Sequence, residues 1–336
     1  MGAIVEYTYG QRLNGGHGLA TPPPLIIVVG PTAVGKSRLA LALAETVGGE
    51  IVAADSMQVY RGLDIGTAKS GADEQRRVPH HLLDLVDPDE RFTAADYARL
   101  ARTAVADIRR RGHVPIMVGG TGLYVRAFLC GLFEAPGEQM PLRDEFRREA
   151  AKGGVAALHR RLHALDPEAA AAIHPNDLFR IIRALEVVTL TGRPPSVLKA
   201  EALRNHEPIP EPVLQFGLGR DRHELYQRIE RRVEEMMARG FLDEVRNLLD
   251  HGYSPALKPL RAIGYRHMIE HLKGPTTLDD AVGCFKRDTR RYAKRQITWF
   301  RHETCLQWHY VEGSAFIEQA LGAFIERIEG TWAKAV

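Results

Sequence analysis

Residues Leu25–Ser37 read LIIVVGPTAVGKS, and this stretch decides the fold. Its first five residues form a continuous apolar run, which is typical of a parallel strand buried on both faces. The remaining residues, from Gly30 to Ser37, match the pattern G-x-x-x-x-G-K-[ST] and precede an amphipathic helical segment. A strand, a glycine-rich turn and a helix in this order predict a phosphate-binding loop (P-loop) in an α/β protein.

Further strand and helix patterns extend this unit along the chain. Residues 51–54 and 114–118 are short apolar runs, and we expect each to form a strand of the same sheet. Between them, the Thr93–Asp96 pattern predicts a capping box at the start of a helix. Residues 213–218 and 306–310 predict later strands. This alternation indicates a parallel sheet flanked by helices.

A change in composition marks a second part of the chain. From about Ala135 to Leu190 the sequence is rich in Ala, Arg and Leu, and the helix breaker Gly192–Pro195 follows. We expect an all-helical subdomain inserted into a P-loop NTPase-like α/β core, with long charged helices at 221–271 and 279–300. The expected parts are a flexible N-terminal tail at 1–23, a core formed by 24–134 and 211–336 that carries the basic C-terminal helices, and a helical insertion at 135–210.

Composition restricts the class of protein. With 336 residues, of which 45% are hydrophobic and 26% charged, the chain resembles ordinary soluble globular proteins. Its net charge of +3 does not by itself indicate a nucleic-acid partner. The cysteines Cys130, Cys284 and Cys305 lie far apart without the spacing of a zinc site, which fits a reducing cytoplasm. No apolar stretch reaches the ~20 residues that span a bilayer, so we expect a cytoplasmic protein without a membrane partner.

The loop chemistry predicts a polyphosphate ligand. Backbone N–H groups of the loop and of the helix N-terminus surround phosphate oxygens, Lys36 supplies a point charge, and the Ser37 hydroxyl reaches Mg²⁺. The pattern is typical of ATP-binding and other nucleotide-binding proteins, so it does not identify the polyphosphate. The residues expected to bind a diphosphate are Gly30, Thr32, Ala33, Val34, Gly35, Lys36 and Ser37.

Phosphoryl transfer from ATP is one activity that such a loop supports. It normally requires a second carboxylate at a strand end to hold the metal, and Asp55 and Asp87 are candidates. The expected strand at 114–118 leads instead into Gly119–Tyr124, which contains no acid. A kinase is therefore an open alternative that this pattern does not favour.

Seven motifs, in order along the chain, point to one family. They are GPTAVGKS at 30–37, DSMQVY at 55–60, DIGTAK at 64–69, VGGTGLY at 118–124, HPND at 174–177 with Arg180 and Arg183 after it, RAIGYR at 261–266 and KRQITWFR at 294–301. Together they cover roughly Leu25 to Arg301 and closely resemble the tRNA dimethylallyltransferase family, also called the IPP transferase family.

The resemblance implies both a substrate pair and a reaction. A dimethylallyl group would pass from dimethylallyl diphosphate to N6 of the adenosine at tRNA position 37, adjacent to the 3′ side of the anticodon. The tRNAs modified would be those that read codons beginning with U. The products would be N6-(dimethylallyl)adenosine and diphosphate.

The same resemblance gives Asp55 and Thr121 catalytic roles. An exocyclic adenine amine is a poor nucleophile, so a positioned base assists by taking its proton, and Asp55 resembles the base of the family. Thr121 resembles the residue that hydrogen-bonds at the reacting centre, and Arg228 is a further candidate for the diphosphate. Each also has a plainer interpretation: a turn cap or a kinase metal ligand for Asp55, a helix cap for Thr121, and an exposed helical cation for Arg228.

A basic helix and several motifs predict the RNA partner. Between Phe285 and Arg301 lie seven Lys or Arg and one Asp, with Tyr292, Trp299 and Phe300 among them. Such a helix can contact a phosphate backbone, and a stacked adenine must flip out of the anticodon loop to be modified. The tRNA contacts that the resemblance implies are Asp55, Ser56, Met57, Gln58, Thr121, Arg143, Phe179, Arg180, Arg183, Arg261, Gly264, Tyr265, Arg266, Lys294, Arg295, Gln296, Trp299 and Arg301.

Three other functions share some of these features. An isopentenyltransferase acting on free adenine nucleotides would share the loop and Asp55 but would not need roughly 100 extra basic and helical residues. A small-metabolite kinase would not need the basic helix, and an RNA-binding protein with a vestigial loop would leave Lys36, Ser37 and Thr121 without a shared purpose. We therefore favour a Mg²⁺-dependent, cytoplasmic and monomeric tRNA prenyltransferase whose helical insertion grips the anticodon stem-loop.

Overall fold

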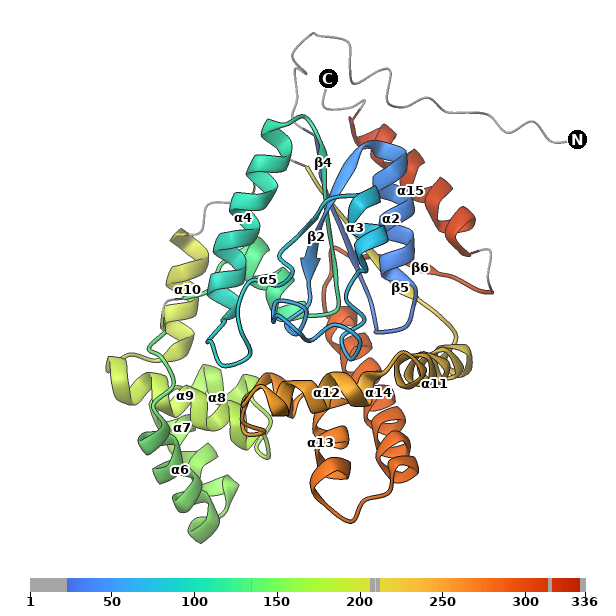
Figure 1. Cartoon of the computed structure of the whole chain (residues 1–336). Helices are drawn as coiled ribbons and strands as arrows, with labels where there is room; N and C mark the ends of the chain where they lie inside the picture. The colour runs from blue at the N-terminus through green and yellow to red at the C-terminus, as the bar shows by residue number, and fades with distance from the viewer. Residues whose placement is uncertain (1–22, 134, 206–208, 210–211, 314–315, 333–336) are drawn as a thin grey trace, which may run out of the picture. The chain divides into compact units, whose positions relative to one another are not determined.

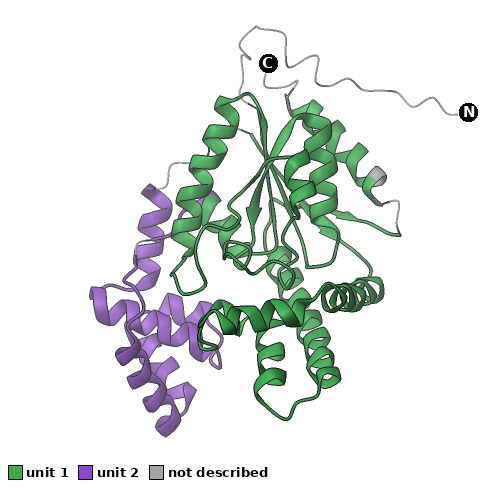
Figure 2. Ribbon diagram, viewed as in Figure 1, with its two compact units in different colours: residues 1–128, 209–336 green, residues 129–208 purple. Residues whose placement is uncertain are grey.

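The computed structural model describes residues 23–133, 135–205, 209, 212–313 and 316–332. The chain divides into two compact units, a core of residues 1–128 and 209–336 and a helical unit of residues 129–208 (Figure 2). The helical unit begins before the predicted boundary at 135, because helix α5 (Gly122–Cys130) runs across the division. The predicted tail at 1–23 lies outside the described residues except for its last residue.

The core is built on a parallel sheet with the strand order β3-β2-β4-β1-β5-β6. Its described strands are β1 (Leu25–Val29), β2 (Gly49–Ala54), β3 (His80–His81), β4 (Val114–Gly119), β5 (Val213–Gly219) and β6 (Gln307–Tyr310). The predicted α/β fold is confirmed, although two-residue β3 is too short to leave an apolar pattern in the sequence. Val29 and Ala54 both pair with Gly119, so three neighbouring strands end at the same level.

Helices cover both faces of this sheet (Figure 1). On one face lie α2 (Lys36–Val47) and α15 (Phe316–Trp332), which bury an apolar stripe against β1 and β5. The rings of Phe216 in β5 and Phe324 in α15 stack there with centroids 3.8 Å apart. On the other face lie α4 (Ala94–Arg110) and α5, while the short α3 (Ala72–Arg77) precedes β3.

The predicted capping box is present at the start of α4. The Asp96 amide donates to Thr93 Oγ1 at 3.1 Å, and the Thr93 amide donates to Asp96 Oδ2 at 3.0 Å. These reciprocal bonds satisfy two backbone donors that a helix start otherwise leaves unpaired. The helix then ends at Arg110.

A group of helices lies beyond the carboxyl ends of the strands (Figure 1). It consists of α11 (Arg222–Ala238), α12 (Phe241–Asp250), the 3-10 turn η1 (Pro259–Arg261), α13 (Tyr265–Lys273) and α14 (Leu278–Arg301). Helix α14 contacts both α11 and α13. The basic helix predicted at 279–300 is therefore part of the core and faces the end of the sheet where ligands bind in α/β proteins.

The second unit is helical throughout its regular structure. Its described helices, after α5, are α6 (Met140–Gly153), α7 (Val155–Leu165), α8 (Pro167–Ala172), α9 (Leu178–Thr191) and α10 (Pro195–Asn205). Phe146, Leu158 and Ile181 belong to its own apolar core. The predicted breaker separates α9 from α10. In neither unit does a described helix have the length and apolarity needed to cross a bilayer.

Candidate active site

The phosphate loop joins β1 to α2 in a tight turn. Gly30 has a φ of 146°, and a Cβ there would lie 2.5 Å from the Leu218 carbonyl oxygen, so only glycine fits. Gly35 precedes α2 with a φ of 115°, which turns the first amides of that helix toward the loop. Arg228 supports the loop from α11, because its Nε donates to the Ala33 carbonyl at 2.9 Å. Arg228, which was predicted to contact the diphosphate, therefore lies against the phosphate loop.

Lys36 lies folded against the loop carbonyls. Its Nζ donates to the carbonyl oxygens of Gly30 at 2.9 Å and Pro31 at 2.8 Å. Burial lowers the pKa of Lys36 to about 7, the Arg232 charge acts in the same direction, and Asp55 opposes both. The amine is therefore divided between its neutral and charged forms near neutral pH, and a bound polyanion would favour the charged form.

Arg232 of α11 is a second cation near the phosphate loop, because it lines the same pocket as Lys36. None of the sequence motifs includes it. Burial lowers its pKa, against the effect of Asp55, but a guanidinium stays charged. Within the described parts of the chain, no hydrogen-bond or salt-bridge partner holds this guanidinium. The sequence did contain a signal for this residue. Arg232 lies on the apolar face of α11, one turn from buried Ile229 and one turn from buried Met236.

The two predicted catalytic residues lie at adjacent strand ends because β2 and β4 are neighbours in the sheet. Asp55 directly follows β2, and its Oδ1 accepts a hydrogen bond from the Met57 amide at 2.8 Å. Thr121 follows β4, and its Oγ1 accepts from the Ser56 amide at 3.0 Å. The Thr121 amide in turn donates to the Ala54 carbonyl at 3.1 Å. These bonds tie the two strand ends together and fix both side chains beside the phosphate loop.

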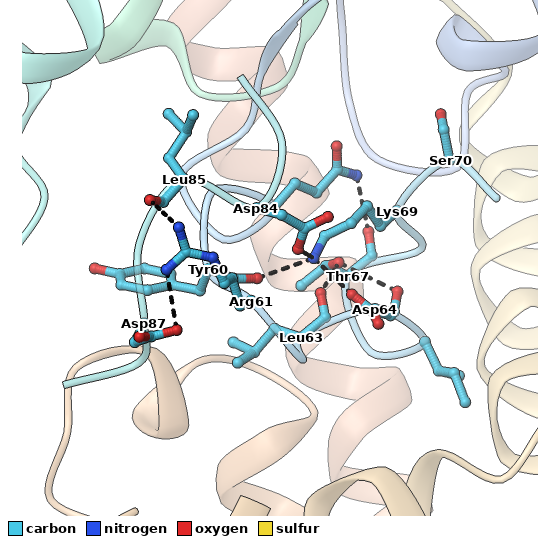
Figure 3. Close-up of polar contacts among 12 residues, drawn as sticks. Tyr60, Arg61, Leu63, Asp64, Thr67, Lys69, Ser70, Asp84, Leu85 and Asp87 are labelled. Atoms are coloured by element: carbon cyan, nitrogen blue, oxygen red, sulfur yellow. Dashed lines mark hydrogen bonds and ion pairs between the residues drawn. The ribbon is translucent and has the colours of Figure 1, made fainter. Parts of the chain in front are cut away.

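A network centred on Lys69 shapes the segment after Asp55 (Figure 3). Lys69 Nζ is buried and donates to the Tyr60 carbonyl at 2.9 Å, to Asp64 Oδ1 at 2.6 Å and to Asp84 Oδ1 at 2.5 Å. Three acceptors thus use all three N–H bonds of the ammonium group. Gln58 is one of the predicted tRNA contacts. Its side-chain Nε2 donates a hydrogen bond to the Thr67 carbonyl at 3.2 Å, within the same segment.

Glu244 of α12 holds this segment from the other side. Its carboxylate accepts hydrogen bonds from three successive backbone amides, those of Asp64 at 3.1 Å, Ile65 at 2.6 Å and Gly66 at 3.2 Å. The Tyr265 hydroxyl donates to the same carboxylate at 2.6 Å. The DIGTAK motif therefore acts here as the anchor that positions the Asp55–Gln58 segment.

One pocket is lined by Lys36, Asp55 and Arg232, and every residue that lines it belongs to the core. Thr121 directly follows the lining residue Gly120 but does not itself line the pocket. Its walls come from the phosphate loop, the ends of β2 and β4, α11, η1 to α13, and α14. The predicted RNA contacts on its wall are Asp55, Ser56, Met57, Gln58, Arg261, Tyr265, Arg266, Arg295 and Gln296. Lys294 and Arg301 are exposed on α14, Gly264 lies at the start of α13, and Trp299 places its ring 4.4 Å from the Arg126 guanidinium.

The four predicted contacts in the helical unit differ in their surroundings. Phe179 is 68% exposed and Arg180 is also exposed. Arg143 is buried, and its guanidinium forms a two-bond pair with Glu186 at 2.9 and 2.8 Å. Arg183 also turns back to Glu186, at 2.5 Å. Because Glu186 is fully buried, its charge requires these cations, so both arginines stabilise the unit from within.

The predicted Mg²⁺ has a suitable but sparse set of protein donors. Ser37 lines the pocket, and a single hydroxyl leaves most positions around Mg²⁺ to phosphate oxygens and water. No cluster of three His, Cys, Asp or Glu side chains suited to a metal ion occurs in the described residues. This set fits a cation that arrives with a diphosphate.

Similarity to known proteins extends over most of the chain. A family model described as IPP transferase matches residues 58–303. A tRNA dimethylallyltransferase of Geobacter metallireducens is 54% identical over 284 residues, which is 84% of this chain and 91% of that protein. The tRNA dimethylallyltransferase of Geobacter sulfurreducens is 50% identical over 293 residues, covering 87% of this chain and 94% of that protein.

Solved structures are similar as well. The full-length tRNA isopentenylpyrophosphate transferase of Bacillus halodurans has a TM-score of 0.66 and 41% identity, over 93% of this chain and 98% of that one. A eukaryotic dimethylallyltransferase described as acting on tRNA has a TM-score of 0.70 and 28% identity, over 86% of this chain and 74% of that one. This chain therefore belongs to the IPP transferase family, the family of the tRNA dimethylallyltransferases.

Proposed function

We propose that the protein transfers a dimethylallyl group from dimethylallyl diphosphate to N6 of adenosine 37 in tRNAs that read codons beginning with U. The products are N6-(dimethylallyl)adenosine and diphosphate. One observation carries the proposal: a single pocket places the phosphate loop, with Lys36 and Arg232, beside Asp55 at the adjacent strand end. The pocket thus contains cations that can stabilise a diphosphate leaving group and a carboxylate that can act as the base for the nucleophile.

The phosphate loop stabilises the leaving group. As the C1–O bond of the substrate breaks, its electron pair departs with the diphosphate, which gains negative charge. Loop amides, Lys36 and Arg232 are positioned to receive that charge. Mg²⁺, bound through Ser37 and phosphate oxygens, would neutralise further negative charge. Ionisation of the allylic C–O bond of this diphosphate ester depends mainly on such stabilisation.

Asp55 serves the nucleophile. The bond from the Met57 amide to Oδ1 fixes the orientation of the carboxylate, so that it can accept the N6 proton as the new C–N bond forms. Thr121 lies within the same set of strand-end hydrogen bonds and borders the reacting centre. Deprotonation matters because the lone pair of the adenine amine is delocalised into the ring.

Cationic residues around the pocket bind the RNA. Arg261, Arg266 and Arg295 lie on the pocket wall, and Lys294 is exposed on α14. The target base is flipped into the pocket, while these side chains hold the backbone of the anticodon loop. In the helical unit, exposed Phe179 offers a ring on which a base can stack. The enzyme acts as a monomer in the cytoplasm.

The test is transfer of radiolabel from dimethylallyl diphosphate to an unmodified tRNA that reads U-initial codons. The parallel acceptors are AMP and the same tRNA with guanine at position 37. Label only in the tRNA that keeps its adenine supports the proposal. Label in AMP would instead favour an enzyme of free nucleotides, and phosphate transfer from ATP without prenyl transfer would favour a kinase.

Two matched variants test the role of Asp55. Asp55→Asn keeps an acceptor for the Met57 amide but cannot take a proton, so kcat should fall by about 10²- to 10⁴-fold with tRNA affinity nearly unchanged. Asp87→Asn removes the other acid considered for the metal, which pairs with Arg61 at 3.1 Å, and transfer should continue. Equal activity of the two variants would reject Asp55 as the base.

A further inference from the structure

Helix α14 contacts both loops that border the pocket through one buried side chain, Gln296. The Thr32 amide of the phosphate loop donates to Gln296 Oε1 at 2.8 Å. Gln296 Nε2 donates to the Gly120 carbonyl at 2.9 Å, on the residue directly before Thr121. The side chain is 6% exposed, so its amide spans the gap between two loops that the sequence separates by more than eighty residues.

The surroundings leave little room for this side chain to move. A Cβ at Gly120 would lie 2.2 Å from Gln296 Nε2, and one at Gly122 would lie 2.0 Å from Trp299 Nε1. Tyr292, one turn before Gln296, interacts through its hydroxyl with both Thr121 and Gln296. Three residues on the inner face of α14 therefore hold the Thr121 loop.

We propose that Gln296 is a positioning residue that sets the separation between the phosphate loop and the Thr121 loop, so that the allylic carbon and the adenine N6 meet. The inference rests on the proposed function, because it assigns the two loops to the two substrates. It differs from the RNA contact that the KRQITWFR motif implies for this residue. A displacement of about 1 Å between reacting groups can cost roughly 100-fold in rate, which makes such a link valuable.

The chemistry of the link is specific to an amide. Thr32 requires an acceptor and Gly120 requires a donor, and a glutamine side chain presents one of each at the same reach. A glutamate has the same shape, but its ionised form presents two acceptors and repels the Gly120 carbonyl. Protonated glutamate again offers one donor and one acceptor. Burial beside a carbonyl favours this protonated form, so it should be populated at mildly acidic pH.

The experiment measures kcat, the KM for each substrate and tRNA affinity for wild type, Gln296→Met, Gln296→Glu and Lys294→Ala. Gln296→Met should lower kcat by about 10- to 100-fold at every pH with tRNA affinity within about twofold. For Gln296→Glu, the ratio of its kcat to that of wild type should rise about five- to tenfold from about pH 8 to about pH 6. Lys294→Ala should show the opposite division, with tRNA affinity falling more than kcat.

Taking ratios to wild type at each pH removes the pH effects that arise from the other ionisable side chains lining the pocket. These are Lys36, Asp55, His80, Arg232, Arg261, Tyr265, Arg266, Tyr292 and Arg295. A Gln296→Glu ratio that does not change with pH would overturn the inference, as would a loss confined to tRNA affinity. Wild-type transfer is scored first. If wild type transfers and Gln296→Met matches it, the inference alone fails; if wild type does not transfer, the proposed function fails and the inference with it.

Discussion

Binding of a diphosphate should draw a proton onto Lys36, and replacement of this lysine by arginine should remove that uptake. Burial, reinforced by Arg232, lowers the pKa of Lys36 to about 7 in the free protein. An anion beside the amine stabilises its charged form and raises the pKa again. Binding and protonation are therefore linked, and the linkage grows as the pH rises through the pKa of the free protein.

The size of the effect follows from the pKa of about 7. If the bound form stays protonated, each ligand should bring an uptake of about a tenth of a proton at pH 6, about half at pH 7 and nearly one at pH 8.5. Over the same range the affinity falls as the neutral form of the free protein becomes dominant. Between pH 7 and pH 9 the expected loss is about 50-fold.

Isothermal titration calorimetry with inorganic pyrophosphate and Mg²⁺ measures this directly, because proton uptake makes the heat depend on the ionisation enthalpy of the buffer. Pyrophosphate also titrates, so Lys36→Arg provides the matched control, with a cation that stays charged throughout. The difference between wild type and the variant should grow from pH 6 to pH 8.5. Equal uptake by the two proteins at pH 8.5 would refute the reasoning, since it would show that Lys36 is already charged before the ligand binds.

Three further predictions concern stability and RNA binding. Glu50→Gln should lower the free energy of unfolding in urea at pH 7 by about 1–3 kcal/mol, because the buried carboxylate accepts from Arg111 at 2.9 Å. Burial raises the pKa of Glu50, but the hydrogen bonds from Arg111 and His81 lower it by more, so the pKa is lower in the folded protein than in the unfolded chain. The stabilisation is therefore complete above the unfolded-state pKa and should shrink as the pH falls through the folded-state pKa. Glu244→Ala should speed amide hydrogen exchange at residues 64–66 by about tenfold, because those amides lose their acceptor, and unchanged exchange would contradict the anchor. Lys294→Ala should reduce the slope of log Kd for tRNA against log salt by about one in filter binding, and an unchanged slope would exclude a phosphate contact.

The phosphate loop could be predicted because its signal is local. Five apolar residues, a glycine-rich turn and a helix follow one another without interruption in Leu25–Val47, and no distant contact is needed to recognise them. The placement of Asp55 and Thr121 at adjacent strand ends could not be predicted in this way, since it depends on β2 lying beside β4 in the sheet. The sequence places both residues after strands, but it does not state which strands are neighbours.

The sequence pattern alone does not reveal the roles of Arg232 and Gln296. Both occur on helix faces that are otherwise apolar: Arg232 between buried Ile229 and Met236, and Gln296 between buried Ala293 and Phe300. A polar side chain on such a face indicates a buried partner or ligand, yet its identity comes only from the folded chain. For Arg143 the resemblance implies an RNA contact, and the structure adds a pairing of its guanidinium with buried Glu186 that no sequence pattern indicates.

The chemistry assigned to this pocket explains why a phosphate loop occurs without the usual acid at the end of β4 (Val114–Gly119). In phosphoryl transfer the loop holds the phosphorus that is attacked, and a strand-end carboxylate must fix the metal beside it. In prenyl transfer the attacked atom is carbon, and the loop holds the group that leaves. The end of β4 is then free to carry glycines and Thr121, which allow Gln296 and the substrate to approach closely. The acid moves to the end of β2, where Asp55 serves the nucleophile instead of the metal.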